Sequence, residues 1–217
     1  MLSLEQSKSL MVAANRYAQE ITPEALEYLN ARGISELVAA EYSLGVVTDP
    51  APGHELHVGW LSIPYLTANG LCVGFKFRRL DGGQPKYGSP SGQKGHLYNV
   101  TDILKNSSRI VVCEGELDTI IVSGILKLPA VGVPGATAWK DHYARLLNGY
   151  NTVYILGDND EGRKEGENPG LEFSRRVAGE VENSIIVSLP PGTDINEYYL
   201  REGIDAARRI LGVTSSD

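Results

Sequence analysis

The chain has 217 residues, 42% of them hydrophobic and 22% charged, and a net charge of −7. This length and composition fit one or two globular domains and exclude a chain that is disordered throughout. No apolar run approaches the ~20 residues that span a bilayer, and the first residues lack the basic and apolar parts of a secretory signal. The two cysteines, Cys72 and Cys113, are too far apart for a four-ligand zinc site or a disulfide framework. We therefore expect a cytoplasmic protein with neither a membrane partner nor zinc.

The first hundred residues predict a helical start followed by strands. Helices are expected over residues 3–20, 22–33 and 35–42. Thr22 and Ser35 are suited to cap the second and third of these helices, and Gly33 is suited to end the second. Strands are expected over residues 44–47, 57–66 and 71–80. The stretch 81–95 is rich in Gly, Pro and Ser, which is typical of a linker-like loop.

After residue 108 the pattern changes to short, almost wholly apolar strands separated by helices. The expected strands are Arg109–Cys113, Ala130–Val133, Thr152–Leu156 and Ser184–Leu189. The expected helices are 116–126, 138–147, 170–180, 194–201 and 203–211. Alternation of fully buried strands and helices indicates βαβ units and a parallel sheet covered on both faces. The fold class is therefore α/β, with a smaller α+β subdomain at 1–108 and the parallel-sheet domain at 109–217.

Carboxylates follow three of the four expected parallel strands. Glu114 comes directly after the first strand, Asp158 and Asp160 follow the third, and Asp194 follows the fourth. Because ligands of an open parallel sheet bind beyond the carboxyl ends of its strands, we expect these acids at one edge. Clustered oxygen ligands without His or Cys suit Mg²⁺ or Mn²⁺, and such a cation favours phosphoryl or nucleotidyl transfer or phosphodiester hydrolysis. Glu114 is the candidate for the acid–base or metal-positioning role.

The negative net charge hides a basic middle stretch. Residues 60–110 contain seven Lys and Arg side chains against two Asp, whereas the rest of the chain holds 13 basic and 25 acidic residues. One interpretation of this stretch is a solvated strand face. The other is a local groove for phosphates, served by acids elsewhere that bind a metal. The aromatic rings of this stretch at alternating strand positions are expected in the core, and Tyr87 is the better candidate for an exposed contact.

The strand context and spacing of the acids resemble the TOPRIM domain, which bacterial-type primases, topoisomerases and some nucleases share. Its signature is an acidic residue after the first strand and Asp-x-Asp after the third. These features are matched here by Glu114 in Glu-Gly-Glu-Leu-Asp and by Asp158 and Asp160 in Gly-Asp-Asn-Asp. The resemblance implies a C-terminal parallel sheet flanked by helices, preceded by a smaller basic α+β subdomain.

The segments before these acids resemble the primase branch. That family has a basic subdomain with a GF…R segment, a PKY segment and a lysine shortly before LY, and the chain has Gly74–Arg78, Pro85–Tyr87 and Lys94–Tyr98. Residues 28–34 resemble the helix that opens that subdomain, and Pro190–Gly203 resembles the family's downstream acidic motif. The resemblance covers roughly residues 24–203 and is greatest to compact phage-encoded primases.

The resemblance also implies roles for individual residues. Glu114, Asp158 and Asp160 would be catalytic, and the metal ligands would be Glu114, Asp158, Asp160 and Asp194. The expected contacts to nucleic acid or nucleotide are Arg78, Lys86, Lys94, Lys76 and Tyr87. Asp118 and Asn196 are further candidates beside the metal. Asn196 stands where the family usually has a second aspartate, which leaves a third metal contact and the number of metals open.

The leading hypothesis is a primase catalytic core that uses Mg²⁺ or Mn²⁺ to make short RNA primers from NTPs on single-stranded DNA during replication. The alternative is a TOPRIM nuclease that hydrolyses phosphodiesters with the same acids. A topoisomerase needs a tyrosine nucleophile in further domains, which this length does not hold. A non-catalytic binding module of the recombination-mediator kind usually has a four-cysteine zinc site, which is lacking here. Because a zinc module and a P-loop motif are also lacking in these residues, we expect a zinc-binding module and a replicative helicase to act in trans.

Overall fold

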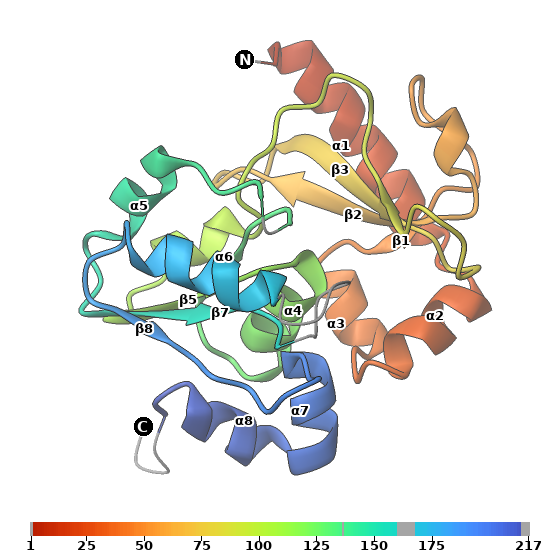
Figure 1. Cartoon of the computed structure of the whole chain (residues 1–217). Helices are drawn as coiled ribbons and strands as arrows, with labels where there is room; N and C mark the ends of the chain where they lie inside the picture. The colour runs from red at the N-terminus through yellow and green to blue at the C-terminus, as the bar shows by residue number, and fades with distance from the viewer. Residues whose placement is uncertain (1, 136, 160–167, 214–217) are drawn as a thin grey trace. The chain divides into compact units, whose positions relative to one another are not determined.

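Figure 1 shows the computed structural model of the chain, which describes residues 2–135, 137–159 and 168–213. The chain divides into two compact units, Met1–Gly95 and His96–Asp217, and each is described by itself. Each unit holds one four-stranded sheet. The change between units falls at Gly95, so the segment 96–108 lies with the second unit, where Leu97 is buried in the core.

The first unit begins with three helices whose starts follow from their capping residues. They are α1 (Leu4–Gln19), α2 (Pro23–Asn30) and α3 (Glu36–Glu41). The side chains of Ser3, Thr22 and Ser35 each accept a hydrogen bond from a backbone N–H of the first turn. Gly33 has a φ of 70°, a left-handed conformation that suits glycine after the end of α2. The three predicted helices are confirmed.

The first sheet is antiparallel, in the order β1-β2-β3-β4. Its strands are β1 (Gly45–Val46), β2 (Leu61–Leu66), β3 (Cys72–Arg78) and β4 (Tyr87–Gly88). Phe75 and Phe77 point to the face of β3 that packs against α1, and Lys76 and Arg78 therefore point to the other. The prediction of a linker over 81–95 missed β4, because two polar-flanked residues carry no alternating apolar pattern.

The strand expected over residues 57–66 begins later than predicted. Residues Glu55–His57 form a 3₁₀ turn instead, and β2 starts at Leu61. His57 is buried there, with its ring stacked on Phe77 at a centroid distance of 4.2 Å. The first residues of the expected strand therefore belong to a turn, from which the His57 ring packs on the sheet.

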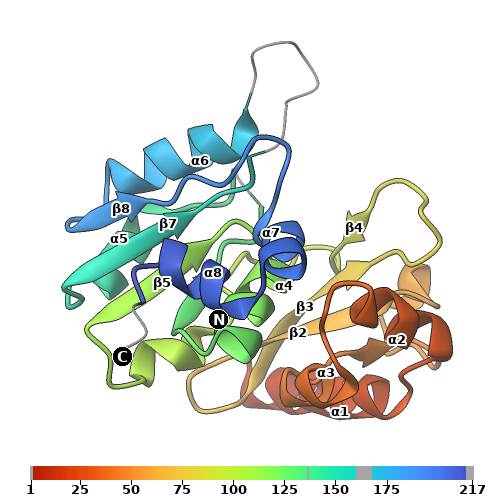
Figure 2. The ribbon, with the colours of Figure 1, turned by 90° about the horizontal axis from the view of Figure 1, so that it is seen from below.

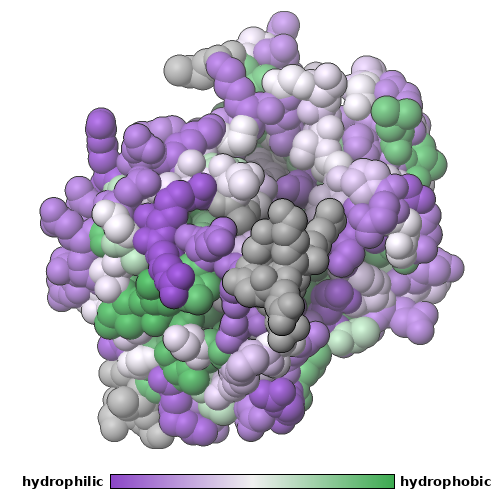
Figure 3. Space-filling view, viewed as in Figure 1, coloured by the Kyte–Doolittle hydropathy of each residue, from purple (hydrophilic) through white to green (hydrophobic). Residues whose placement is uncertain are grey.

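The second sheet is parallel, as predicted, in the order β6-β5-β7-β8. Its strands are β5 (Arg109–Cys113), β6 (Ala130–Gly132), β7 (Thr152–Leu156) and β8 (Ser184–Ile186). The expectation of four fully buried strands is wrong for β8. This strand is the edge of the sheet, Ile185 is 50% exposed, and a hydrophobic patch lies over this edge in Figure 3.

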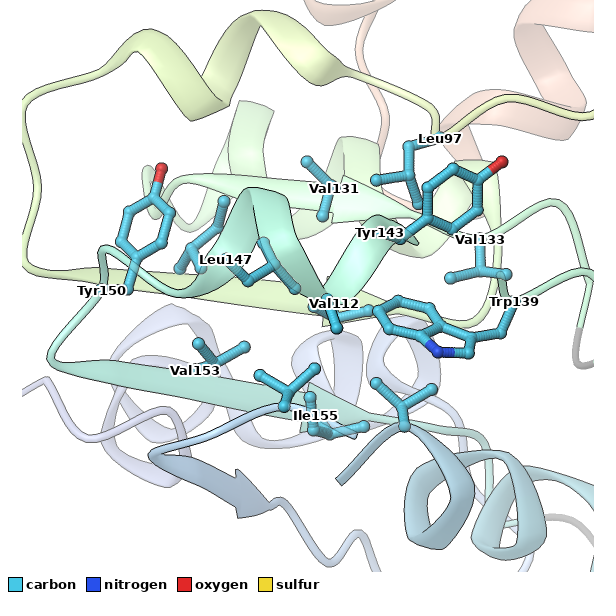
Figure 4. Close-up of a cluster of buried hydrophobic side chains, with 14 of the residues drawn as sticks. Leu97, Val112, Val131, Val133, Trp139, Tyr143, Leu147, Tyr150, Val153 and Ile155 are labelled. Carbon is cyan, nitrogen blue, oxygen red and sulfur yellow. The ribbon is translucent and has the colours of Figure 1, made fainter. Parts of the chain in front are cut away.

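Helices cover both faces of the second sheet. They are η2 (Val100–Leu104), α4 (Glu116–Ile120), α5 (Asp141–Leu147), α6 (Pro169–Ala178), α7 (Ile195–Glu202) and α8 (Ile204–Ile210). On one face, α5 and α6 bury the main core of the unit with the inward side chains of β5, β6 and β7 (Figure 4). On the other face lie α4 and α8 (Figure 2), joined where Arg208 donates a 2.8 Å hydrogen bond to the carbonyl oxygen of Leu126.

The helix expected over 116–126 forms in two parts. It is α-helical over α4 and continues as a π-helical turn over Ile121–Ile125. A widened turn of this kind often marks a functional region. None of the described helices is long and apolar enough to cross a membrane.

Candidate functional site

The carboxyl ends of β5 and β7 bring two of the predicted acids together. Cys113 pairs with Leu156 in the parallel register, so Glu114 and the residues after β7 emerge side by side. The backbone N–H of Asp158 donates a 3.3 Å hydrogen bond to Oε2 of Glu114. The carboxylate of Glu114 is thus held against the segment that carries Asp158, as the strand positions predicted.

Asp118 lies one turn further, in the first turn of α4. A Cβ at Gly115 would lie 2.8 Å from Oδ2 of Asp118, so this carboxylate lies close to the backbone that follows Glu114. Burial raises the pKa of Asp118 to about 7. Neighbouring carboxylates add to the increase, and in order of effect they are Asp194, Glu114 and Glu116.

Asp194 joins the same cluster from the start of α7. It is the N-cap of this helix, and its Oδ1 accepts a 2.7 Å hydrogen bond from the backbone N–H of Glu197. Its influence on the pKa of Asp118 shows that the two carboxylates lie near each other. Asn196 follows in the first turn and is buried. Asp160 lies outside the described residues. We call Glu114, Asp118, Asp158 and Asp194 the acidic edge.

A second group of predicted residues gathers on the first unit. Lys76 and Arg78 share a face of β3, and Arg78 pairs with Tyr87 of β4. The Arg78 guanidinium lies 4.7 Å from the Tyr87 ring centroid, and the Lys76 ammonium lies 5.3 Å from it. Both distances fit cation–π contacts. The register of β3 and β4 thus places these three side chains together.

Two further residues, which the sequence analysis did not assign, extend this group. The ring of Tyr28 on α2 lies 5.1 Å from the Arg78 guanidinium on one side and 4.0 Å from the Arg32 guanidinium on the other. We call Arg32, Tyr28, Arg78, Tyr87 and Lys76 the cation–aromatic ladder. Tyr28 lies on α2 and Arg32 in the turn that follows it, within the stretch 28–34 that resembles a family segment, but no pattern in the sequence pairs them with Arg78.

Lys86 and Lys94 lie on the loops on either side of β4. Both side chains are exposed. The loop that carries Lys94 is fixed by its neighbour, because the Gln93 amide accepts from the N–H of Phe75 at 2.7 Å and donates to its carbonyl oxygen at 2.9 Å. Gly74 of β3 has no room for a Cβ beside this amide. The structure therefore brings Lys76, Arg78 and Tyr87 together but leaves Lys86 and Lys94 on separate loops.

Comparison with known proteins assigns the chain. The gene 57 protein of Mycobacterium phage D29 is 38% identical over 155 residues, which cover 70% of this chain and 97% of that protein. A DNA primase of Neisseria meningitidis is 29% identical, over 88% of this chain and 38% of the primase. The chain belongs to the family of this phage gene 57 protein and is homologous to bacterial DNA primases. No protein-family model matches it.

Solved primase structures share the fold. The zinc-binding and RNA polymerase domains of the Aquifex aeolicus primase match with a TM-score of 0.77 and 22% identity, over 98% of this chain and 63% of that chain. The RNA polymerase domain of the Mycobacterium tuberculosis primase DnaG matches with a TM-score of 0.76 and 21% identity, over 98% and 84%. The predicted α/β primase-core fold is thereby confirmed. The chain spans 38% of the Neisseria meningitidis primase and 44% of the Aquifex aeolicus primase that it matches.

The donor chemistry of the acidic edge fits a hard divalent cation, because every candidate ligand is an oxygen. Among the described residues, no group of three or more His, Cys, Asp or Glu side chains is arranged to hold a metal ion. Burial is the main cause of the raised pKa of Asp118, and the neighbouring carboxylates Asp194, Glu114 and Glu116 raise it further. A divalent cation would offset the repulsion between these carboxylates. The fit of the acidic edge to Mg²⁺ or Mn²⁺ thus rests on the type of its donor atoms and on electrostatics.

Proposed function

We propose that this chain is a primase catalytic core that synthesises short RNA primers from NTPs on single-stranded DNA during replication. The observation that carries the proposal is the pairing of Glu114 with the Asp158 segment, beyond the carboxyl ends of neighbouring strands of a primase-core fold. The similarity of the chain to the gene 57 protein of a phage agrees with a phage origin and with action in the cytoplasm of a bacterial host.

In this proposal each residue of the acidic edge has a role. Glu114, Asp158, Asp160 and Asp194 hold Mg²⁺ or Mn²⁺, and Asp118 and Asn196 stand beside them. The cation supplies charge neutralisation at the attacking and leaving oxygens of nucleotidyl transfer. Glu114 is the catalytic acid–base group of this proposal, and the hydrogen bond from the Asp158 backbone N–H to its Oε2 holds its carboxylate beside the metal ligands.

The cation–aromatic ladder provides the nucleic-acid contact of the first unit. Lys76 and Arg78 bind phosphates of the template or the nucleotide, and the Tyr87 ring gives a stacking surface between the cations. Lys86 and Lys94 add further phosphate contacts.

Solved relatives support DNA as a partner of this core. A solved DnaG primase catalytic domain is bound to single-stranded DNA, and the Mycobacterium tuberculosis domain is solved in complex with double-stranded DNA. We infer that single-stranded DNA is the template here. We also propose that a zinc-binding module and a replicative helicase act from outside these 217 residues, because the sequence contains two cysteines and no GxxxxGK[ST] motif.

A primer-synthesis assay tests the proposal. The purified chain is incubated with single-stranded DNA, labelled ATP and GTP, and Mg²⁺ or Mn²⁺, beside Asp158→Asn and the exposed α6 control Glu172→Gln. Short labelled RNAs are expected from the wild type and the control, and none from Asp158→Asn. Metal-dependent cleavage of the DNA without RNA synthesis would transfer the assignment to the nuclease alternative. Addition of a zinc module and helicase tests whether they are needed.

A further inference from the structure

Asn159, the central residue of Asp158-Asn159-Asp160, uses all four of its polar groups in hydrogen bonds. Its backbone N–H donates to the carbonyl oxygen of Thr193 at 3.0 Å, and its backbone carbonyl accepts from the N–H of Gly192 at 2.7 Å. Its side-chain Nδ2 donates to the carbonyl oxygen of Leu189 at 2.5 Å, and its Oδ1 accepts from Nδ2 of Asn168 at 2.7 Å. The residue is therefore fixed in position and in side-chain orientation.

These bonds join three segments that are distant in sequence. Three of them go to the segment 189–193, which ends next to Asp194, and the fourth goes to Asn168, the N-cap of α6. Asn168 keeps its capping bond at the same time, since its Oδ1 accepts from the N–H of Leu171 at 2.9 Å. Asn159 thus ties the loop after β7 to the start of α6 and to the approach to α7.

The neighbouring backbone is packed as tightly as the polar bonds suggest. A Cβ at Gly170, the second residue of α6, would meet the carbonyl oxygen of Asp158. A Cβ at Gly157 would meet the carbonyl oxygen of Gly170. The backbone that carries Asp158 therefore contacts α6 directly, and Asn159 binds the same loop to the segment 189–193.

We propose that Asn159 is a positioning residue that holds Asp158 and Asp194 at the spacing a divalent cation needs. The inference rests on the proposed function, because it assigns the cation to the acidic edge. A side chain needed only for the turn would bond its own nearby backbone, whereas the Asn159 side chain bonds Leu189 and Asn168 outside the turn. Aspartate at this position would lose the donor to Leu189 and place a further charge beside Asp158, and alanine would lose both side-chain bonds.

Binding of Mn²⁺ to the full chain, followed by electron paramagnetic resonance, tests the proposal without use of activity. Asn159→Ala is expected to raise the Mn²⁺ dissociation constant about 10-fold, the low end of the effect of residues that orient metal ligands. Asn168→Ser keeps a good N-cap but removes the donor to Asn159, so a smaller rise of about threefold is expected. Ser174→Ala is the matched control, because it removes a buried hydrogen bond of α6, to the carbonyl oxygen of Gly170 at 2.9 Å, without contact to Asn159.

The melting temperature in EDTA, measured on the same variants, separates positioning from a purely structural role. The proposal is supported if the Mn²⁺ affinity falls for both Asn variants and stays at the wild-type value for Ser174→Ala, even where all three lose stability. It is overturned if the Asn variants lose stability as Ser174→Ala does and bind Mn²⁺ as the wild type does, or if the wild type binds no Mn²⁺. Should Asn159→Ala fail to fold, Asn168→Ser alone decides by the same criterion. A wild type that binds Mn²⁺ but makes no primers counts against the proposed function and leaves this test of Asn159 intact.

Discussion

The two units of the chain hold their charged side chains in opposite ways. In the first unit, the cations of the ladder alternate with tyrosine rings, so that Arg78 lies between Tyr28 and Tyr87. In the second unit, carboxylates have other carboxylates as neighbours, and the pKa of Asp118 is raised to about 7. The ladder is stable without a ligand because ring faces attract cations. In the proposed function a divalent cation offsets the charge of the acidic edge, so removal of that cation is expected to affect the second unit far more than the first.

The two units also respond to pH in opposite directions. His54 of the first unit is buried, and burial lowers its pKa. The Tyr17 hydroxyl accepts from the N–H of Ala51 at 2.8 Å and shares a 2.9 Å hydrogen bond with Nδ1 of His54, so the histidine is held inside the unit, away from water. The first unit therefore loses stability when acid protonates His54, whereas the second loses stability when base ionises Asp118.

The largest expected effect is on catalysis and comes from Glu114→Gln. The neutral amide keeps an oxygen that can accept from the N–H of Asp158, so the fold is retained, but it neither takes a proton nor attracts a cation. Primer synthesis is expected to fall by about 10²–10⁴-fold, the usual contribution of an acid–base group. Turnover under saturating DNA and NTPs is the measurement.

Thermal unfolding in EDTA provides the second readout for this variant. Removal of one negative charge near Asp118 is expected to keep or raise the melting temperature, and Glu172→Gln on exposed α6 serves as the charge-matched control. A Glu114→Gln chain with normal turnover would remove Glu114 from the catalytic machinery. A chain with lost turnover and a much lower melting temperature would assign it a structural role instead.

Much of the fold was predictable because its signals are local. Ser35 caps α3 and Thr22 caps α2 through contacts within one turn, and the apolar runs after residue 108 are long enough to identify the parallel strands. The errors occur where tertiary structure decides. β8 is partly exposed whereas β6, the other edge strand, is buried, a difference that their apolar sequences do not reveal. The π-helical turn at Ile121–Ile125 has no pattern that differs from an α-helix.

The second expected effect, on nucleic-acid affinity, comes from Arg78→Ala. Loss of this side chain removes a phosphate contact and the cation between Tyr28 and Tyr87. Affinity for single-stranded DNA is expected to fall by about 1–3 kcal/mol, and the slope of log affinity against log salt to decrease by about 1. Fluorescence anisotropy between about 50 and 200 mM salt measures both quantities.

Arg145→Ala, an exposed arginine on α5 of the second unit, is the matched control for the ladder. It removes the same charge from another place and is expected to leave the salt slope unchanged. Equal losses from Arg78→Ala and Arg145→Ala would mean that net charge, rather than the ladder, controls DNA binding. Equal affinity of the wild type at both salt concentrations would exclude phosphate contacts altogether.

The site was less predictable than the fold. Glu114 and Asp158 were found because strand ends in a parallel sheet share an edge, a rule that needs no side-chain information. Arg32 and Tyr28 were missed because they lie more than 40 residues before Arg78 in the sequence, and only packing brings α2 to β3. The four hydrogen bonds of Asn159 were also missed, because their partners are brought to it by packing. In the sequence, an asparagine between two acids resembles an ordinary turn residue.

The third expected effect is an opposite pH dependence of stability in the two units, which the two tryptophans can report separately. Trp60 lies in the first unit and Trp139 in the second, where its indole N–H donates to Glu180 at 2.9 Å. A carboxyl whose folded pKa is raised is stabilising below its unfolded pKa and loses this contribution as pH rises through the folded value. The free energy of urea unfolding seen by Trp139 is therefore expected to decrease progressively between about pH 4 and 8 in EDTA.

The opposite sign applies to Trp60. A histidine whose folded pKa is lowered binds its proton more readily in the unfolded chain, so stability seen by Trp60 is expected to decrease as pH falls below about 6.5. Single-tryptophan chains, Trp60→Phe and Trp139→Phe, separate the two signals. Asp118→Asn should flatten only the Trp139 profile, and Mg²⁺ should do the same. If stability changed with pH in the same direction at both tryptophans, the contrast between the two units would be wrong.

The smallest expected effect concerns the loop that carries Lys94. Gln93→Ala removes two hydrogen bonds to the backbone of Phe75, each worth about 1 kcal/mol at most after exchange with water. The loop then becomes more mobile, and Lys94 loses part of its placement rather than its charge. Affinity for single-stranded DNA is expected to fall by about threefold, less than for Lys94→Ala.

A double-mutant cycle shows whether Gln93 acts through Lys94. If the amide only holds the loop for its neighbour, Gln93→Ala has no further effect on DNA affinity once Lys94→Ala is present. Independent, additive losses would mean that Gln93 contacts the nucleic acid itself or that β3 is disturbed. The ladder variant Arg78→Ala distinguishes these two cases, because a disturbed β3 would make Gln93→Ala and Arg78→Ala non-additive, whereas a direct contact of Gln93 would leave them additive.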